Sequence, residues 1–251
     1  MSHPSQDSDT ARDLATRAGQ LLLQVRVRAF TDAAERKAAG DQESHRFLVD
    51  QLAQRQPGDA VLSEEGADDP ARLDADRVWI VDPLDGTREF SEPDRADWAV
   101  HVALWARGDL VAGAVAVPAE GLTLSTAEPL RLSHRETGPL RLAVSRSRPP
   151  SLVQDLAARL DGELVPMGSA GVKAMAVVRG YVDAYVHGGG QYEWDSAAPV
   201  AVARAAGLHT SRLDGSPLAY NQPDPWLPDL VICRPELADQ LIGTLAGLPR
   251  S

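Results

Sequence analysis

The sequence is poor in cysteine, lysine and aromatic residues. Its one cysteine, Cys233, excludes an intramolecular disulfide and any metal site built on several cysteines, and it favours a reducing compartment. Only two of the 25 basic residues are lysines, Lys37 and Lys173, and 36 acidic residues give a net charge of −11. This charge argues against binding to a nucleic-acid polymer or an anionic membrane. Because aromatic residues make up only 5% of the chain, the core must rest mainly on aliphatic side chains.

Long apolar runs are also missing. No stretch approaches the roughly 18 residues that a membrane-spanning helix needs, and the first ten residues lack the basic and apolar regions of a signal peptide. We therefore expect a cytoplasmic protein. The six histidines lack the i, i+4 spacing of a zinc helix, so each of them, His101 included, is expected to be a surface or packing residue. The 251 residues suffice for one large α/β domain or two small ones.

Residues 78–87 join a short apolar run to two carboxylates three positions apart. The β-branched and aromatic run predicts a strand that is buried on both faces and ends at Asp82. Pro83 lacks an N–H and is expected to end the pairing and to begin a turn. This turn directs the carbonyl of Leu84 and the carboxylate of Asp85 back towards Asp82, so that three oxygen donors converge.

The next two residues suit an anion. Gly86 permits close approach of the backbone, and the N–H groups of Gly86 and Thr87 can face a phosphate. Cation ligands beside an anion cradle are what a metal-bridged phosphate requires. An acidic surface turn after a buried strand fits this stretch equally well, so the other acidic residues must decide between the two interpretations.

Further acidic residues fall at predicted junctions of secondary structure. Glu64 and Glu65 follow a short strand, whose alternation allows only one of them to be a direct ligand. Asp41 and Asp195 stand at predicted helix starts, and for Asp41 simple helix capping is the alternative. Ligands that are all oxygen favour Mg²⁺, Mn²⁺ or Ca²⁺ over zinc.

The remaining pattern predicts a mixture of helices and strands, with Thr10 as the cap of the first helix and a mobile loop at residues 187–190. Helices are predicted at 11–36, 41–54, 151–160, 171–179, 195–206 and 235–245. Strands are predicted at 60–62, 98–105, 110–117, 121–126, 129–133, 140–145, 164–165, 182–186, 208–211 and 230–233. The middle third is thus expected to be a mostly antiparallel sheet.

The prolines at 149 and 150 break the chain, so we expect two halves. Residues 1–147 would form an N-terminal α+β half with most metal ligands and the phosphate-binding turn. Residues 148–251 would form a C-terminal α/β half with the last ligand and the elements that select the substrate.

Three motifs, at residues 62–66, 82–87 and 194–198, resemble the signature of the inositol monophosphatase-like, lithium-sensitive magnesium phosphatases. The resemblance covers most of the chain. It implies a layered α-β-α-β-α sandwich that hydrolyses small phosphate monoesters with water as the direct nucleophile. It also implies two or three Mg²⁺ ions per site, with Mn²⁺ as a possible substitute and Li⁺ as an inhibitor.

The resemblance also assigns roles to residues. It implies that the metal ligands are Glu64, Asp82, the Leu84 carbonyl, Asp85 and Asp195. Gly86 and Thr87 would cradle the phosphate, while Asp41, paired with the Thr87 hydroxyl, and Glu64 would orient and deprotonate the water. The family usually has Thr three residues before this Asp, but Ala38 stands there, so one supporting hydrogen bond is absent. On the substrate side it implies Ser169, Lys173 and Gly188, together with Asp85 and Asp195.

The substrate is expected to be a small phosphorylated metabolite. Residues 185–190, 194–198 and 214–220 look most like the bacterial 3′(2′),5′-bisphosphate nucleotidase (CysQ-type) branch. That branch converts 3′-phosphoadenosine 5′-phosphate to AMP and phosphate, which links it to sulfate assimilation. Inositol-1-monophosphatase or fructose-1,6-bisphosphatase activity is the alternative, and a homodimer is possible.

Two other classes remain as rivals. A haloacid-dehalogenase-like phosphatase is disfavoured, because its two aspartates are two positions apart, whereas Asp82 and Asp85 are three apart. A non-catalytic regulatory protein that binds Mg²⁺ or a nucleotide is disfavoured by the presence of every ligand position.

Overall fold

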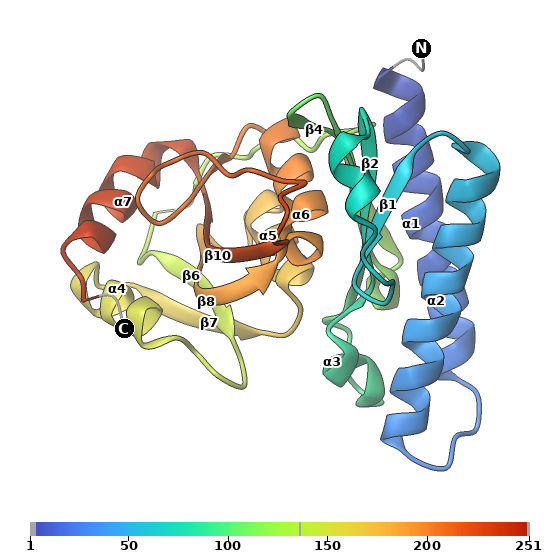
Figure 1. Cartoon of the computed structure of the whole chain (residues 1–251). Coiled ribbons are helices and arrows are strands. Elements are labelled where there is room, and N and C mark those ends of the chain that lie inside the picture. Colours follow the sequence, from blue (N-terminus) through green and yellow to red (C-terminus); the bar gives the residue numbers. More distant parts are fainter. Residues whose placement is uncertain (1–3, 136, 250–251) are drawn as a thin grey trace.

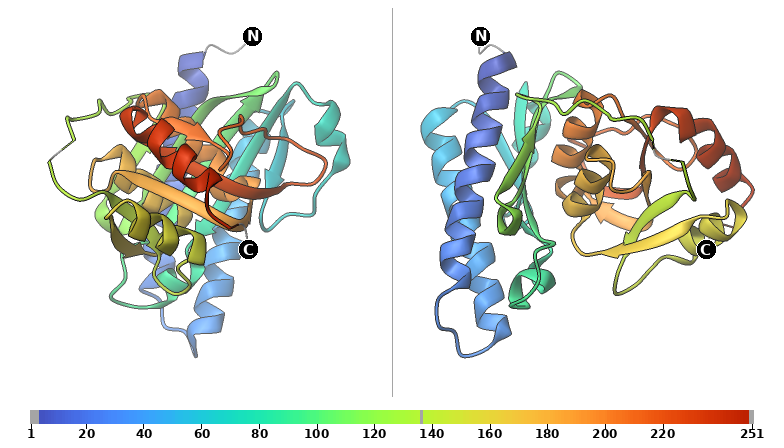
Figure 2. Two further views of the ribbon diagram at one scale, coloured as in Figure 1. Left: turned by 90° about the vertical axis from the view of Figure 1, so that its left-hand side faces the viewer. Right: turned by 180° about the vertical axis from the view of Figure 1, so that it is seen from behind.

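The computed structural model describes residues 4–135 and 137–249 and shows two five-stranded sheets with helices outside and between them (Figure 1). From one side to the other, the layers are α1 and α2, the first sheet, α5 and α6, the second sheet, and α4 with α7 (Figure 2). The predicted α-β-α-β-α sandwich is therefore confirmed. No helix among the described residues is long and apolar enough to cross a membrane.

The first sheet has the order β1-β2-β3-β4-β5. Its strands are β1 Ala60–Ser63, β2 Arg77–Asp85, β3 Ala99–Ala106, β4 Asp109–Val117 and β5 Leu122–Ser125. Only β1 and β2 are parallel, and the predicted hairpin of β3 and β4 is present. Pairing of β2 with β3 is interrupted between Asp82 and Asp85, as expected where Pro83 lacks an N–H. The strand nevertheless continues to Asp85, so its predicted end at Asp82 was wrong.

The second sheet has the order β7-β6-β8-β10-β9. Its strands are β6 Arg141–Ser145, β7 Glu163–Met167, β8 Ala184–Tyr192, β9 His209–Ser211 and β10 Trp226–Cys233. Residues 140–145 were expected in the antiparallel middle third, but β6 lies in this second sheet and is parallel to both β7 and β8. The strand predicted at 129–133 does not form. The division into residues 1–147 and 148–251 stays a prediction.

The helices also differ from the predicted pattern. They are α1 Pro4–Arg26, α2 Ala33–Arg55, α3 Thr87–Ser91, α4 Ser151–Arg159, α5 Ala170–Val178, α6 Glu193–Ala205 and α7 Ala238–Ala246. Short 3₁₀ helices occupy Pro70–Asp74, Pro118–Glu120 and Pro235–Leu237. Thr10 lies inside α1 rather than capping it, and its hydroxyl donates to the carbonyl of Gln6 at 2.9 Å.

Two local predictions near the site were wrong. Asp32 caps α2, and its side chain accepts a hydrogen bond from the N–H of Glu35 at 2.9 Å. Asp41 therefore lies well inside this helix instead of at its start. Residues 187–190 are not a loop, because β8 runs through them and pairs with β10.

The core has three parts that match the layers. Aliphatic side chains of α1 and α2 pack on the outer face of the first sheet, and those of α4 and α7 pack on the outer face of the second. The largest cluster joins the two sheets through α5 and α6. The C-terminal end of β2 and the N-terminal ends of α5 and α6 therefore meet in the middle of the molecule.

Candidate metal and phosphate site

Three aspartates from different parts of the chain converge in this middle layer. Carboxylate oxygens of Asp82, Asp85 and Asp195 all lie within 4.8 Å of one another. Asp82 and Asp85 are buried at the end of β2, and Asp195 is half-buried in the first turn of α6. Three carboxylates so close together suit a hard divalent cation with oxygen ligands.

Hydrogen bonds from nearby backbone N–H groups hold the side chains of Asp82 and Asp195. The N–H of Leu84 donates to Asp82 Oδ1 at 3.0 Å, and the N–H of Tyr192 donates to Asp195 Oδ2 at 2.6 Å. Gly86 follows in the left-handed region, with φ of 84°, and α3 begins directly after it. The turn therefore needs glycine at this position.

Asp85 is held through one oxygen atom. Its Oδ2 accepts hydrogen bonds from the Ser169 hydroxyl and from the N–H of Gly171, the latter at 2.7 Å. The Nε2 atom of His101 lies 3.2 Å from the same oxygen but does not meet the geometry of a hydrogen bond to it. Within the described chain, Oδ1 of Asp85 accepts no hydrogen bond, which leaves it for a cation.

The helix α2 approaches the same turn from the outer layer. The hydroxyl of Ser44 donates to the carbonyl of Pro83 at 2.7 Å. A Cβ atom on Gly40 would lie 2.8 Å from the Phe90 ring and 2.9 Å from Leu84. This close packing explains the glycine and brings Asp41 to the rim of the site.

The carboxylates raise one another's pKa. Burial, followed by the charge of Glu65, raises the pKa of Asp41 to about 7, and burial followed by the charge of Asp85 does the same for Asp195. The pKa of Glu64 also rises to about 7, mainly through desolvation, although solvent screens this exposed side chain. Asp82 is buried beside Glu64 and Asp85, and its pKa lies well above its usual range. These unfavourable charges are what a bound cation would neutralise.

Asp85 and His101 behave differently from the other groups. Burial raises the pKa of Asp85, but His101, Ser169 and Gly171 outweigh burial and hold it below its usual value. Burial alone would lower the pKa of His101, but the Asp85 carboxylate outweighs burial and raises this pKa. The site thus contains one carboxylate that stays ionised and several that favour a proton.

These residues fit a divalent cation. The donors are all oxygen, the hydrogen bonds that Asp85 accepts from described residues all go to its Oδ2 atom, and the neighbouring carboxylates gain from a positive charge. The carbonyl of Leu84 faces the same turn and accepts a bond from the Thr87 hydroxyl at 3.3 Å. The predicted pairing of Thr87 with Asp41 is not among the hydrogen bonds of the described residues.

The predicted substrate-side residues have structural roles here. Ser169 caps α5 and binds Asp85. Lys173 is buried, and its Nζ donates to the carbonyls of Ser169 at 2.7 Å and Gly168 at 3.4 Å. Lys173 is therefore not an ordinary surface lysine. Gly188 faces Leu152 and Leu213, where a Cβ atom would lie within 2.9 and 3.3 Å of them. Contacts of these residues with a substrate stay predictions.

His101 was missed as a part of the site. It is fully buried, in agreement with the prediction of a packing residue, but it packs against a carboxylate. In the sequence, His101 is a single polar residue within the apolar strand predicted at residues 98–105. The register of β3 against β2, which pairs His101 with Asp82, is the signal that would have revealed it.

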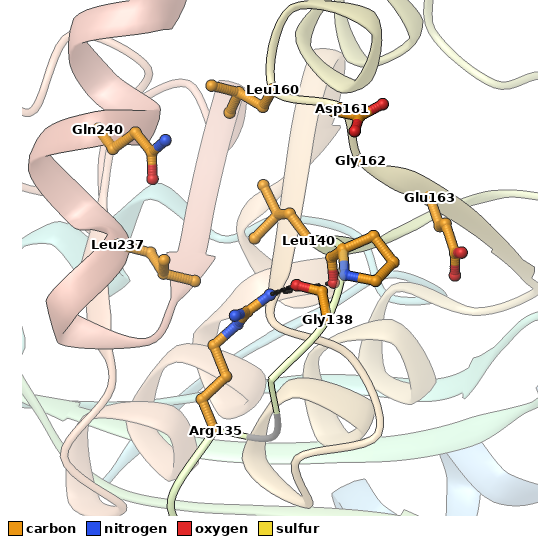
Figure 3. Close-up of a pocket in the computed structure, with 10 residues that line it drawn as sticks. Arg135, Gly138, Leu140, Leu160, Asp161, Gly162, Glu163, Leu237 and Gln240 are labelled. Carbon is orange, nitrogen blue, oxygen red and sulfur yellow. Dashed lines mark hydrogen bonds between the residues drawn. The ribbon is translucent and has the colours of Figure 1, made fainter.

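A separate open pocket of about 700 Å³ lies between the end of α4 and the start of α7 (Figure 3). Among the described residues that line it, the one cation is Arg135, which donates to the carbonyls of Gly138 and Pro139 and pairs with Asp183 at 3.2 Å. The acidic side chains at its edge include Asp161 and Glu163. With its arginine engaged and its rim acidic, this pocket does not suit a phosphate.

Comparison with known proteins agrees with this geometry. The profile described as the inositol monophosphatase family matches residues 3–248. The chain belongs to the inositol monophosphatase family. The predicted resemblance is thus confirmed.

Named relatives and solved structures are similar to this family member over nearly its whole length. A Mycobacterium tuberculosis protein named 3′-phosphoadenosine 5′-phosphate phosphatase is 53% identical over 91% of this chain and 89% of its own. The 3′(2′),5′-bisphosphate nucleotidase CysQ of Escherichia coli K12 is 30% identical over 87% of this chain and 96% of its own. The structure of CysQ from Bacteroides thetaiotaomicron covers 92% of this chain and 97% of its own, with a TM-score of 0.77 and 26% identity.

Proposed function

We propose that this protein is a Mg²⁺-dependent phosphomonoesterase that hydrolyses 3′-phosphoadenosine 5′-phosphate to AMP and phosphate. The observation that carries the proposal is the convergence of Asp82, Asp85 and Asp195 on one point between the sheets. The names of the mycobacterial relatives, which are 50–53% identical, support the choice of substrate. Such an activity would link the protein to sulfate assimilation.

The ligands we assign to Mg²⁺ are Glu64, Asp82, the Leu84 carbonyl, Asp85 and Asp195. When bound, Mg²⁺ neutralises charge on the phosphate and activates water for attack on phosphorus. We propose two or three ions per site, with Mn²⁺ able to replace Mg²⁺ and with Li⁺ as an inhibitor. The burial of Asp82 and Asp85 keeps bulk water away from their shared region and strengthens their attraction for a cation.

The remaining roles fall to groups around these ligands. The N–H groups of Gly86 and Thr87 would bind the phosphate oxygens, and Ser169, Lys173 and Gly188 would lie on the leaving-group side. Asp41, paired with the Thr87 hydroxyl, would orient the attacking water and take its proton, and Glu64 would also hold this water. A pKa of about 7 suits Asp41 to this task near neutral pH. A cytoplasmic location and a homodimer stay predictions.

A comparison of rates tests this proposal. Initial rates of phosphate release should be measured on 3′-phosphoadenosine 5′-phosphate, inositol 1-phosphate and fructose 1,6-bisphosphate, each with Mg²⁺ and with a chelator. We expect the nucleotide to give the highest kcat/KM and the chelator to abolish all release. A preference for inositol 1-phosphate or fructose 1,6-bisphosphate would favour the alternative activities. No phosphate release from any substrate would favour a non-catalytic binding protein.

A further inference from the structure

The buried imidazole of His101 touches three elements of the site at once. It is the third residue of β3, directly opposite Asp82, and its side chain has no solvent exposure. Its Nδ1 atom is 3.0 Å from the carbonyl of Trp194, and its Nε2 atom is 3.2 Å from Oδ2 of Asp85. One ring therefore bridges the end of β2 and the first turn of α6.

The third element is the start of α5. A Cβ atom on Gly171 would lie 2.0 Å from Nε2 of His101, which is far too close for two non-bonded heavy atoms. The ring thus occupies the space where a side chain at position 171 would be. This arrangement lets the N–H of Gly171 reach Oδ2 of Asp85 at 2.7 Å.

These contacts act on two predicted ligands. The groups around Oδ2 fix the rotation of the Asp85 carboxylate and leave its Oδ1 for a cation. The Trp194 carbonyl belongs to the residue before Asp195, so its position bears on where the Asp195 carboxylate stands. The ring therefore links the Asp85 carboxylate to the residue that precedes Asp195.

We propose that His101 is a positioning residue, one that sets the spacing of Asp85 and Asp195 for Mg²⁺ and does not itself bind the metal or the substrate. This inference rests on the proposed Mg²⁺ site. Partners that orient ligands in this way typically change metal affinity by about 10- to 100-fold when they are lost. A residue that only fills space would change stability without changing metal affinity.

Three substitutions separate these roles. His101→Leu keeps most of the volume but removes both polar contacts, His101→Asn keeps a group near the Trp194 carbonyl, and His101→Gln keeps an amide that reaches Asp85. Titration calorimetry with Mg²⁺ should show binding about 10-fold weaker or more for His101→Leu, an intermediate loss for His101→Asn, and a loss within about 3-fold for His101→Gln. His209→Leu removes a histidine contact with Ser211 on β9 and serves as the matched control, with unchanged affinity.

A second measurement tests the contact with Gly171. Gly171→Ala should lower the Tm of the metal-free protein, because its new methyl group meets the His101 ring. Combining Gly171→Ala with His101→Ser removes the ring, so the double variant should lose less Tm than the sum of the two single variants. Strict additivity would mean that the ring does not occupy this space.

The outcomes are distinguishable. If the wild-type protein binds Mg²⁺ and His101→Leu binds it equally well, the positioning role is wrong and the proposed function stands. If the wild-type protein itself fails to bind Mg²⁺, the proposed function is wrong. Circular dichroism of each variant establishes that a change in affinity belongs to a folded protein.

Discussion

The hydroxyl of Ser44 on α2 donates a 2.7 Å hydrogen bond to the carbonyl of Pro83, in the turn that carries the proposed metal ligands. Both groups are buried, so Ser44→Ala leaves this carbonyl without a partner. We expect a loss of about 1–3 kcal/mol in the free energy of unfolding and a several-fold loss of kcat, because α2 also carries Asp41. Thermal unfolding and initial rates check this expectation. Gln42→Ala, at an exposed position of the same helix, should change neither measurement.

Because Gly40 is closely packed, its replacement by alanine should destabilise the protein, whereas the same replacement usually stabilises a helix. Replacing glycine by alanine inside a helix normally adds up to about 1 kcal/mol of stability. Here the new methyl group would meet Phe90 and Leu84 at 2.8 and 2.9 Å, so Gly40→Ala should instead lower the free energy of unfolding by about 1–3 kcal/mol. Gly58→Ala, which has no atom within 4 Å of the added Cβ, is the control. A Gly40→Ala protein as stable as the wild type would contradict the observed contact.

Asp82→Asn should separate activity from stability. The asparagine can still accept the bond from the Leu84 N–H, but it removes a buried charge that its neighbours disfavour. We therefore expect phosphate release to fall to background while the Tm of the metal-free protein stays equal to that of the wild type or rises. Asp50→Asn on the exposed face of α2 should keep full activity. Substantial activity of Asp82→Asn would rule out its assignment as a ligand.

The stability of the metal-free protein should fall as the pH rises. The pKa values of Asp41, Glu64 and Asp195 are raised to about 7 in the folded protein, whereas carboxyl groups of an unfolded chain titrate near ~4. The unfolded chain therefore releases these protons first, and the stability that they provide is lost as the pH rises through about 7.

Thermal unfolding in a chelator should accordingly give a lower Tm at pH 8 than at pH 6. Mg²⁺ should restore the Tm at pH 8 and have less effect at pH 6, because the ligands must lose their protons to bind it. NaCl at equal ionic strength is the control for screening. A Tm in chelator that rises between pH 6 and pH 8 would contradict this assignment of protonation.

Lithium should inhibit the enzyme. Li⁺ is a small, hard cation that prefers oxygen ligands, so we expect it to compete for one of the proposed Mg²⁺ positions among Asp82, Asp85 and Asp195. Initial rates at increasing LiCl and fixed Mg²⁺ measure the effect, with NaCl and KCl as controls. Equal rates in the three salts would argue against the family's lithium sensitivity in this protein.

The sequence predicted the elements whose patterns are local. The apolar run of β2 and the hairpin of β3 and β4 were predicted because β-branched residues and a short polar turn are strong signals. Glu64, Asp82, Asp85 and Asp195 were chosen because they stand at the ends of such elements. The structure brings three of these together directly.

Features that depend on distant neighbours could not be predicted. The start of α2 is polar and exposed, so no apolar periodicity extended the helix back to Ala33 and placed Asp41 inside it. Glycines disfavour strands, yet pairing with β10 holds residues 187–190 in β8. Likewise, neither Asp85 nor the Trp194 carbonyl, the polar partners of His101, adjoins it in sequence.

The contact between His101 and Gly171 also restricts how the two positions can change during evolution. While a histidine occupies position 101, a side chain at position 171 collides with it. A larger residue at position 171 is therefore expected only together with a smaller one at position 101.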